Sequence, residues 1–148
     1  MAGEIISAHA SMEGAALPIL HALQDEFGYV PKQSEPMIAE SLNVSRAEVH
    51  GVISFYHDFR RTPPGRHTLK VCRAEACQSV GAAAMADRLL ARLGVDWGGT
   101  TRDGSLTVEA TFCLGLCACG PAALLDGEPL ARLDDALLHD VTEEARRT

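Results

Sequence analysis

The chain has 148 residues, of which 47% are hydrophobic and 22% are charged, and its formal net charge is −7. This composition is ordinary for a globular protein, and the acidic balance argues against a nucleic-acid partner, because gripping phosphate backbones requires clustered Lys and Arg. We expect a cytoplasmic protein without a membrane segment, since no apolar run approaches the roughly 20 residues of a membrane-spanning helix and the first residues lack the pattern of a signal peptide.

The region 1–62 is predicted to be an N-terminal helical bundle domain. Apolar residues at helical spacing predict a first helix that begins at Leu17 and ends at Gly28. A short second helix is expected over Ser34–Asn43, with Ser34 as its N-cap. The stretch Ser45–Glu48 has the capping-box pattern, so a third helix should begin at Ser45. Three short helices joined by tight turns would form this bundle.

A linker is predicted next, because Pro63-Pro64-Gly65 stops a helix and favours a turn. We therefore place the domain boundary here and expect a second domain over 63–148. Its first strand is predicted over Thr68–Cys72, followed by a helix over Ser79–Leu93. Alternating apolar and polar residues then predict a half-buried strand over Leu106–Phe112.

The last part of the second domain is predicted to be a hairpin and a helix. The strands 122–125 and 128–133 flank Asp126-Gly127, a strong two-residue turn signal, and Pro129 favours an edge strand. Asp134 can cap a final helix, whose charged end after Val141 is expected to fray. The order strand, helix, three strands and helix predicts an α/β layer with a small mixed sheet (α+β for the chain as a whole).

Five cysteines are the most informative residues of the chain. Thiols stay reduced in the cytosol, so a disulfide framework is not expected there, and an odd count also argues against complete pairing. Four of the cysteines form two pairs, Cys72 with Cys77 and Cys113 with Cys117, and each pair follows a predicted strand. Two strand ends of one small sheet can lie side by side, so we expect the four thiolates to meet at one centre.

Four thiolates suit either a [2Fe–2S] cluster or a tetrahedral zinc ion. The wide spacing within each pair favours two irons, one for each pair, but zinc, dithiol redox chemistry and buried structural cysteines remain alternatives. A C-x-x-C redox pattern is absent, which weakens the dithiol interpretation. Cys119 is the surplus thiol, expected to pack beside the site without being a ligand. No residue is assigned a catalytic role.

Two groups of residues stand out in the chain. One is Cys72-x₄-Cys77 together with the Cys113–Pro121 stretch, and the other includes Phe27–Pro31 and Ala47–Tyr56 of the helical region. Both groups resemble the thioredoxin-like [2Fe–2S] ferredoxins, the small iron–sulfur subunits of respiratory complex I and of related NAD-linked hydrogenases and formate dehydrogenases. The resemblance implies a thioredoxin-like second domain and a [2Fe–2S] cluster. It implies that this cofactor is bound by Cys72, Cys77, Cys113 and Cys117.

Within that family, Val71–Gly81 and Cys117–Pro121 look most like the γ subunit of NAD-dependent, molybdenum-containing formate dehydrogenases. This resemblance implies an oxidoreductase in which formate and NAD⁺ give CO₂ and NADH. The partners would be an iron–sulfur subunit that binds FMN and NAD and a catalytic subunit with the molybdenum cofactor. This chain would be a non-catalytic electron-transfer subunit, with complex I or an NAD-linked hydrogenase as the alternative parent.

Two further interpretations are weaker. The turn before the third predicted helix resembles a helix-turn-helix, but that helix lacks the basic face that DNA binding requires. A zinc-stabilised assembly module without redox activity is the alternative from a different functional class.

Overall fold

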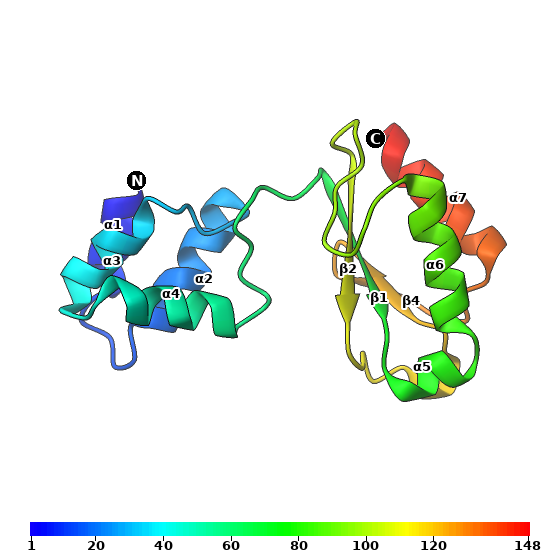
Figure 1. Cartoon of the computed structure of the whole chain (residues 1–148), viewed down its shortest axis with the longest axis horizontal. Coiled ribbons are helices and arrows are strands. Elements are labelled where there is room, and N and C mark those ends of the chain that lie inside the picture. The colour runs from blue at the N-terminus through cyan, green and yellow to red at the C-terminus, as the bar shows by residue number, and fades with distance from the viewer. The chain divides into compact units, whose positions relative to one another are not determined.

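The computed structural model describes all 148 residues of the chain. It divides into two compact units, Met1–Pro63 and Pro64–Thr148, and most of their elements are labelled in Figure 1. Each unit has a hydrophobic core of its own. None of the helices is both long enough and apolar enough to span a bilayer.

The first unit is entirely helical. Its helices are α1 (Ala2–His9), α2 (Ala16–Phe27), α3 (Ser34–Leu42) and α4 (Arg46–Phe55). All four contribute to one core, whose buried members include Ile6, Ile19, Leu20, Leu23, Ile38, Val49 and Ile53. The predicted bundle of three helices was therefore incomplete. Helix α1 buries only Ile6 completely, with Ala2 and Ile5 half-buried against the same core. Its apolar pattern covers little more than one turn, which is too short to predict a helix.

The ends of these helices follow the local chemistry of the sequence. Gly28 and Asn43 end α2 and α3 in the left-handed conformation, as predicted. Ser45 and Glu48 form both hydrogen bonds of a capping box at the start of α4. The predicted N-cap at Ser34 was wrong: Gln33 is the N-cap, and the buried Ser34 hydroxyl instead donates to the Pro31 carbonyl at 2.6 Å.

The second unit contains a mixed four-stranded sheet in the order β2-β1-β3-β4. The strands are β1 (His67–Cys72), β2 (Leu106–Thr111), β3 (Ala123–Leu125) and β4 (Glu128–Leu130). Strand β1 pairs in parallel with β2 and antiparallel with β3, which pairs antiparallel with β4. The predicted hairpin and the edge position of Pro129 are confirmed. Asp126 and Gly127 both have positive φ, at 51° and 89°, as a tight hairpin turn requires.

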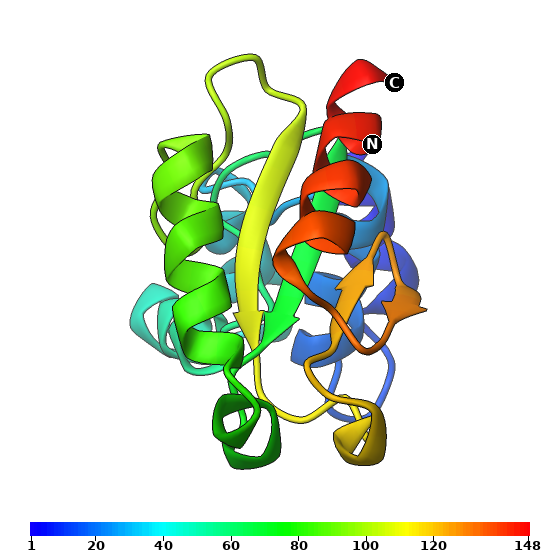
Figure 2. The same ribbon diagram turned by 90° about the vertical axis from the view of Figure 1, so that its right-hand side faces the viewer.

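Helices α6 (Ala82–Leu93) and α7 (Asp135–Arg147) cover the same face of the sheet, as Figures 1 and 2 show. The core lies between these helices and the strands. Its buried members include Leu69, Val71, Met85, Leu89, Leu106, Val108 and Leu138. The remaining elements are the short helix α5 (Glu75–Ser79) and the 3₁₀ turn η1 (Cys117–Cys119).

Two predictions for this unit needed correction. The helix expected from Ser79 begins at Ala82, because Gly81 has φ 93° and separates α6 from α5. The fraying expected after Val141 does not occur, since α7 continues to Arg147. Thr142 and Ala145 are buried on its inner face, and burial of this kind stabilises a helix end despite its charged outer face.

Candidate metal centre

The sheet topology explains why the two cysteine pairs approach each other. Strands β1 and β2 are parallel neighbours, so both end at the same edge of the sheet. Cys72, the last residue of β1, is in register with Thr111, the last residue of β2, and Cys113 follows two residues later. The Arg73 N–H donates to the Thr111 carbonyl at 2.8 Å and holds the two strand ends together. Figure 2 shows α5 and η1 at this edge, beyond the arrowheads of both strands.

The first pair, Cys72 and Cys77, is buried, with 2% of each residue exposed. Cys72 is anchored as a strand residue, and its N–H donates to the Ala122 carbonyl at 3.0 Å. Cys77 lies in α5, which begins three residues after the end of β1. The turn between them lets Cys77 pack against Cys72. The pair packs with small residues, Ala82 and Ala122 among them. Their size leaves room for the backbone to approach both sulfurs.

The second pair, Cys113 and Cys117, is exposed. Its loop is tightly curled, because Cys113 and Gly115 have φ values of 67° and 76°. The two Sγ atoms are 3.8 Å apart. Two thiolates bound to one tetrahedral metal at about 2.3 Å lie about 3.8 Å from each other. This pair therefore already has the spacing of a chelating pair.

Backbone amides from both loops point at Cys72. Burial by itself raises the pKa of the Cys72 thiol. Hydrogen bonds donated by the amides of Ala74, Cys113 and Leu114 and by the Cys77 thiol outweigh burial and hold this pKa below its ordinary value. Since Cys113 and Leu114 belong to the second loop, the amides of one loop stabilise the thiolate of the other.

The remaining thiols also influence one another. Burial raises the pKa of Cys77, and the hydrogen bond with Cys72 and the charge of Cys72 raise it further. A hydrogen bond from the Ala122 backbone acts in the opposite direction and lowers this pKa. The pKa of Cys117 is raised mainly by its hydrogen bond with Cys113, and next by the charge of the Cys113 thiolate. The charge of Cys72 raises it further. Four thiolates at this edge would therefore repel one another. That repulsion would be relieved by a positively charged centre between them.

The sulfurs are arranged as two pairs. No three or more His, Cys, Asp and Glu side chains of the chain surround a single point closely enough to hold one ion. The donor set of four thiols, paired two by two and bonded by backbone amides, fits a binuclear sulfur-ligated group. The structure thus brings together the four cysteines that the sequence singled out.

Cys119 differs from the four in its position. It ends η1, is partly exposed, and has both its backbone groups bonded: its N–H donates to the Leu116 carbonyl at 2.9 Å and its carbonyl accepts from Arg132 at 2.7 Å. The next residue, Gly120, lies against the site, because a Cβ there would be 3.3 Å from Cys77 Sγ. Gly120 therefore fits closely against the buried pair, and an added side chain there would require its neighbours to shift.

The sequence did not reveal one contact of Arg73, the residue that follows Cys72. The Arg73 guanidinium lies over the Trp97 ring, 4.9 Å from its centroid. Trp97 belongs to the loop that follows α6, and no spacing pattern relates it to Cys72. A positive charge next to a proposed ligand is therefore held by an aromatic ring from a distant segment.

Comparison with known proteins supports this description. The family model of the thioredoxin-like [2Fe-2S] ferredoxins matches residues 2–146. The chain is 32% identical over 122 residues to the NADP-reducing hydrogenase subunit HndA of Solidesulfovibrio fructosivorans, covering 82% of this chain and 71% of the relative. It is 35% identical over 127 residues to a subunit of NADH-quinone oxidoreductase from Mycobacterium tuberculosis strain H37Rv, covering 86% of this chain and 50% of that relative.

A solved structure agrees. The crystal structure of an NAD⁺-reducing [NiFe]-hydrogenase in its air-oxidised state contains a similar unit, with a TM-score of 0.70 and 30% identity. The match covers 86% of this chain and 22% of the hydrogenase chain. The chain therefore spans half the length of the mycobacterial relative and about a fifth of the hydrogenase polypeptide.

Proposed function

Because this chain belongs to the thioredoxin-like [2Fe–2S] ferredoxin family, we propose that the two cysteine pairs of the candidate metal centre hold one [2Fe–2S] cluster. The ligands are Cys72, Cys77, Cys113 and Cys117. The observation that carries the proposal is the meeting of a buried pair and an exposed pair at one sheet edge, with amides of the second loop bonded to the first pair.

The proposed role of the chain is one-electron transfer. A bound cluster of this kind accepts and releases a single electron. The residues of the chain hold its ligands, exclude water from one side through the buried pair, and place amide N–H groups on the sulfurs. Such hydrogen bonds stabilise the more negative, reduced state and raise its potential. No general acid, base or nucleophile is needed.

The parent assembly is proposed to be an NAD-linked oxidoreductase in the cytoplasm. Both relatives described above are named as subunits, one of an NADP-reducing hydrogenase and one of NADH-quinone oxidoreductase. We infer that this chain is likewise the small electron-transfer subunit, and that it exchanges electrons with an iron–sulfur subunit that binds FMN and NAD.

We further propose that the parent enzyme is an NAD-dependent formate dehydrogenase with a molybdenum-containing catalytic subunit. This choice rests on the residues from Val71 to Gly81 and from Cys117 to Pro121 alone, because the relatives described above belong to hydrogenases and NADH-quinone oxidoreductases. Those two classes of enzyme are the alternative parents.

We also propose that the two units are separate domains, a helical domain over 1–62 and a ferredoxin domain over 63–148. The two hydrophobic cores and the proline pair at the division support this.

The cluster is tested by analysing the chain purified under anaerobic conditions. We expect a reddish-brown protein with two irons and two acid-labile sulfides per chain, and a rhombic EPR signal after reduction with dithionite. A colourless protein with one zinc per chain would replace the electron-transfer role with that of a zinc-stabilised assembly module.

The parent enzyme is tested by purifying the chain with its natural partners and measuring metals and flavin. Molybdenum together with FMN supports the formate dehydrogenase. Nickel would point to a hydrogenase, and the presence of FMN with neither metal would favour complex I.

A further inference from the structure

A groove lies between α6 and α7 in the second unit. Its volume is about 340 Å³. Both helices contribute to its lining, which consists of Met85, Arg88, Leu89 and Arg92 of α6 and of Asp135 and Leu138 of α7. None of these residues belongs to the two cysteine-bearing loops, so the groove is distinct from the candidate metal centre.

The floor of the groove is apolar. Met85, Leu89 and Leu138 belong to the core of this unit, and no more than 4% of each residue is exposed. We call these three residues the apolar floor. Preformed concave sites with an apolar lining and a few polar groups are typical of small-molecule binding, and a volume of about 340 Å³ is at the lower end of their usual range of about 300–1,000 Å³.

One of the two arginines beside this floor already has a carboxylate partner. Arg88 donates to both carboxylate oxygens of Asp135, from Nε at 3.1 Å and from Nη2 at 2.8 Å. This is the bidentate geometry of a strong arginine–carboxylate pair. The charge of Asp135 is therefore used by Arg88, and the pair joins the two helices across the groove.

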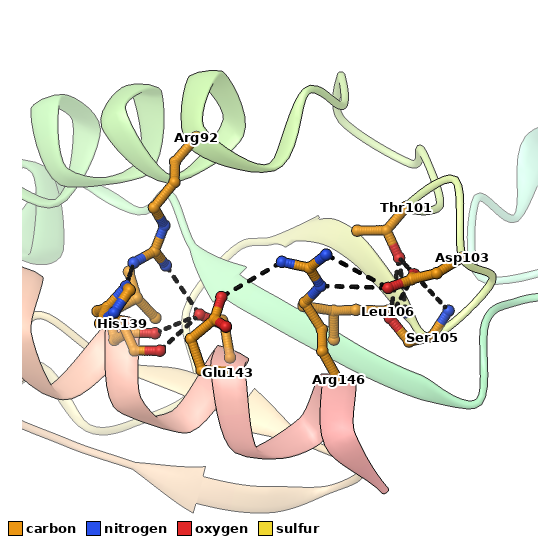
Figure 3. Close-up of polar contacts among 10 residues, drawn as sticks. Arg92, Thr101, Asp103, Ser105, Leu106, His139, Glu143 and Arg146 are labelled. Carbon is orange, nitrogen blue, oxygen red and sulfur yellow. Dashed lines mark hydrogen bonds and ion pairs between the residues drawn. The ribbon is translucent and has the colours of Figure 1, made fainter.

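The second arginine, Arg92, is bonded to neutral groups. Its Nη2 donates to the Thr142 hydroxyl at 2.8 Å, and its Nη1 contacts Nδ1 of His139, as Figure 3 shows. A guanidinium has five N–H donors and no acceptor, so the His139 nitrogen must accept, which requires the neutral ring. Neither bond involves a carboxylate, and donors of Arg92 remain for a further acceptor.

The position of Arg92 is also fixed. Thr142 is buried, and its hydroxyl donates to the Leu138 carbonyl at 2.8 Å, so its oxygen is free to accept from Arg92. An anion that binds here meets a guanidinium that is already held at the edge of the apolar floor, and such preorganisation lowers the entropic cost of binding. The planar donors of arginine match the two oxygens of a carboxylate.

We propose that the groove between α6 and α7 binds a small amphipathic carboxylate, whose charged group pairs with Arg92 and whose aliphatic body lies on the apolar floor. The single arginine without a carboxylate partner favours a monoanion over a dianionic phosphate group. The cysteines take no part in this site, so its existence does not depend on the proposed cluster.

The test is isothermal titration calorimetry of the purified full chain with three probes that share an eight-carbon body: octanoate, 1-octanol and octyltrimethylammonium. We expect octanoate to bind one molecule per chain, at least tenfold more tightly than either of the other probes, because only octanoate brings a negative charge to Arg92. Inorganic phosphate, which has no apolar body, should not displace it.

Three variants locate the site. Arg92→Gln removes the charge and should weaken octanoate binding at least tenfold, whereas Arg92→Lys keeps the charge and should recover most of the affinity. Arg102→Gln, in an exposed loop, is the matched control and should bind like the unmodified chain. Both Arg92 variants lose the arginine fork that bonds Thr142 and His139, so the lysine variant separates loss of charge from loosening of the helix pair.

The proposal is supported if octanoate binding follows the charge at position 92 across these variants. Absence of octanoate binding to the unmodified chain at millimolar concentration would overturn it. Equal binding of the three probes would also overturn it, since the groove would then be an apolar site only. Displacement by inorganic phosphate, equal weakening in Arg102→Gln, or the same loss in Arg92→Lys as in Arg92→Gln would contradict the assignment of the carboxylate to Arg92.

Discussion

Gly120 has no side chain, and this lets Cys77 and Val80 pack close to its backbone. An ideal Cβ there would be 3.3 Å from Cys77 Sγ, which is tighter than ordinary contacts, and 3.4 Å from Val80 Cγ2. We predict that Gly120→Ala lowers the free energy of unfolding of the iron-loaded protein by about 1 kcal/mol or more, through overpacking.

The control for this prediction is Gly51→Ala. Gly51 is a residue of α4, and nothing lies within 4 Å of an added Cβ there. Alanine is the better helix former by about 0.5–1 kcal/mol, so this variant should be more stable. Denaturant unfolding of both variants makes the comparison, and equal stability changes in the two would contradict the packing argument.

The charge of Arg73 is predicted to tune the proposed cluster. It adjoins Cys72 and is held over Trp97 at 4.9 Å. A nearby positive charge favours the reduced state, which carries one more negative charge. Arg73→Gln should therefore lower the reduction potential, by about 40 mV if the lost interaction is about 1 kcal/mol.

Trp97 is a positioning residue in this account. Trp97→Leu frees the guanidinium and should shift the potential as well, whereas Trp97→Phe keeps an aromatic face and should shift it less. Arg102→Gln removes a charge from an exposed loop position and serves as the control. EPR-monitored redox titration gives these values. An unchanged potential in Arg73→Gln would show that the charge does not reach the cluster.

At the scale of elements, α7 is tied to the loop before β2 by Asp103, as Figure 3 shows. The Asp103 carboxylate accepts hydrogen bonds from the hydroxyls of Ser105 and Thr101 and from the Arg146 guanidinium. Arg146 also pairs with Glu143 of its own helix. These contacts explain why the charged last turn of α7 remains helical.

This arrangement predicts an acid sensitivity. Hydrogen bonds hold the pKa of Asp103 well below its ordinary value. The bond from the Ser105 hydroxyl contributes most, followed by the bonds from the Thr101 hydroxyl and the Ser105 amide. Because the folded-state pKa is depressed, the stabilisation is complete above the unfolded-state pKa of about 4 and is lost as the pH falls below it. Asp103→Asn should therefore reduce the Tm at pH 7, and the difference from the unmodified protein should shrink toward pH 3.

Thermal unfolding of both proteins at pH 7 and pH 3 provides the measurement. Both proteins are compared in the iron-free form at both pH values, so that acid loss of iron does not enter the Tm difference. A Tm difference that is the same at both pH values would mean that the charge of Asp103 contributes nothing.

At the scale of the whole molecule, each unit has its own core. The helical unit packs around Ile19, Leu20 and Leu23, and the other unit around Leu69, Val71 and Val108. All four proposed ligands belong to the second unit. We predict that residues 63–148 expressed alone bind two irons and give the EPR signal of the full chain, and that residues 1–62 unfold cooperatively. Failure of 63–148 to retain iron, while the full chain does, would contradict the proposed division into domains.

Much of this architecture could be predicted because its signals are local. Gly28, Asn43 and Ser45 act on backbone groups within one helical turn, so the ends of α2, α3 and α4 are visible in the sequence. Asp126-Gly127 likewise encodes its own turn. Helix α1 escaped prediction because its only buried residue is Ile6, and the fraying expected of α7 missed the contact with Asp103, which lies 43 residues away from Arg146.

The site was predictable to a similar degree. Cys72 and Cys113 follow strands directly, so parallel pairing was enough to bring their loops together. The contrast between the buried pair and the exposed pair was not predictable, because it depends on how Ala82 and Ala122 pack around Cys77. The contact between Arg73 and Trp97 depends on a long loop whose path no local pattern describes.

The most direct test of the four-cysteine site is the iron content of the five single Cys→Ala variants, purified anaerobically under one protocol. We predict that the Cys72, Cys77, Cys113 and Cys117 variants each lose most of their iron and the rhombic EPR signal. The Cys119 variant should keep two irons and an unaltered signal. Loss of half or more of the iron in Cys119→Ala, or full iron in any of the other four, would contradict the assignment.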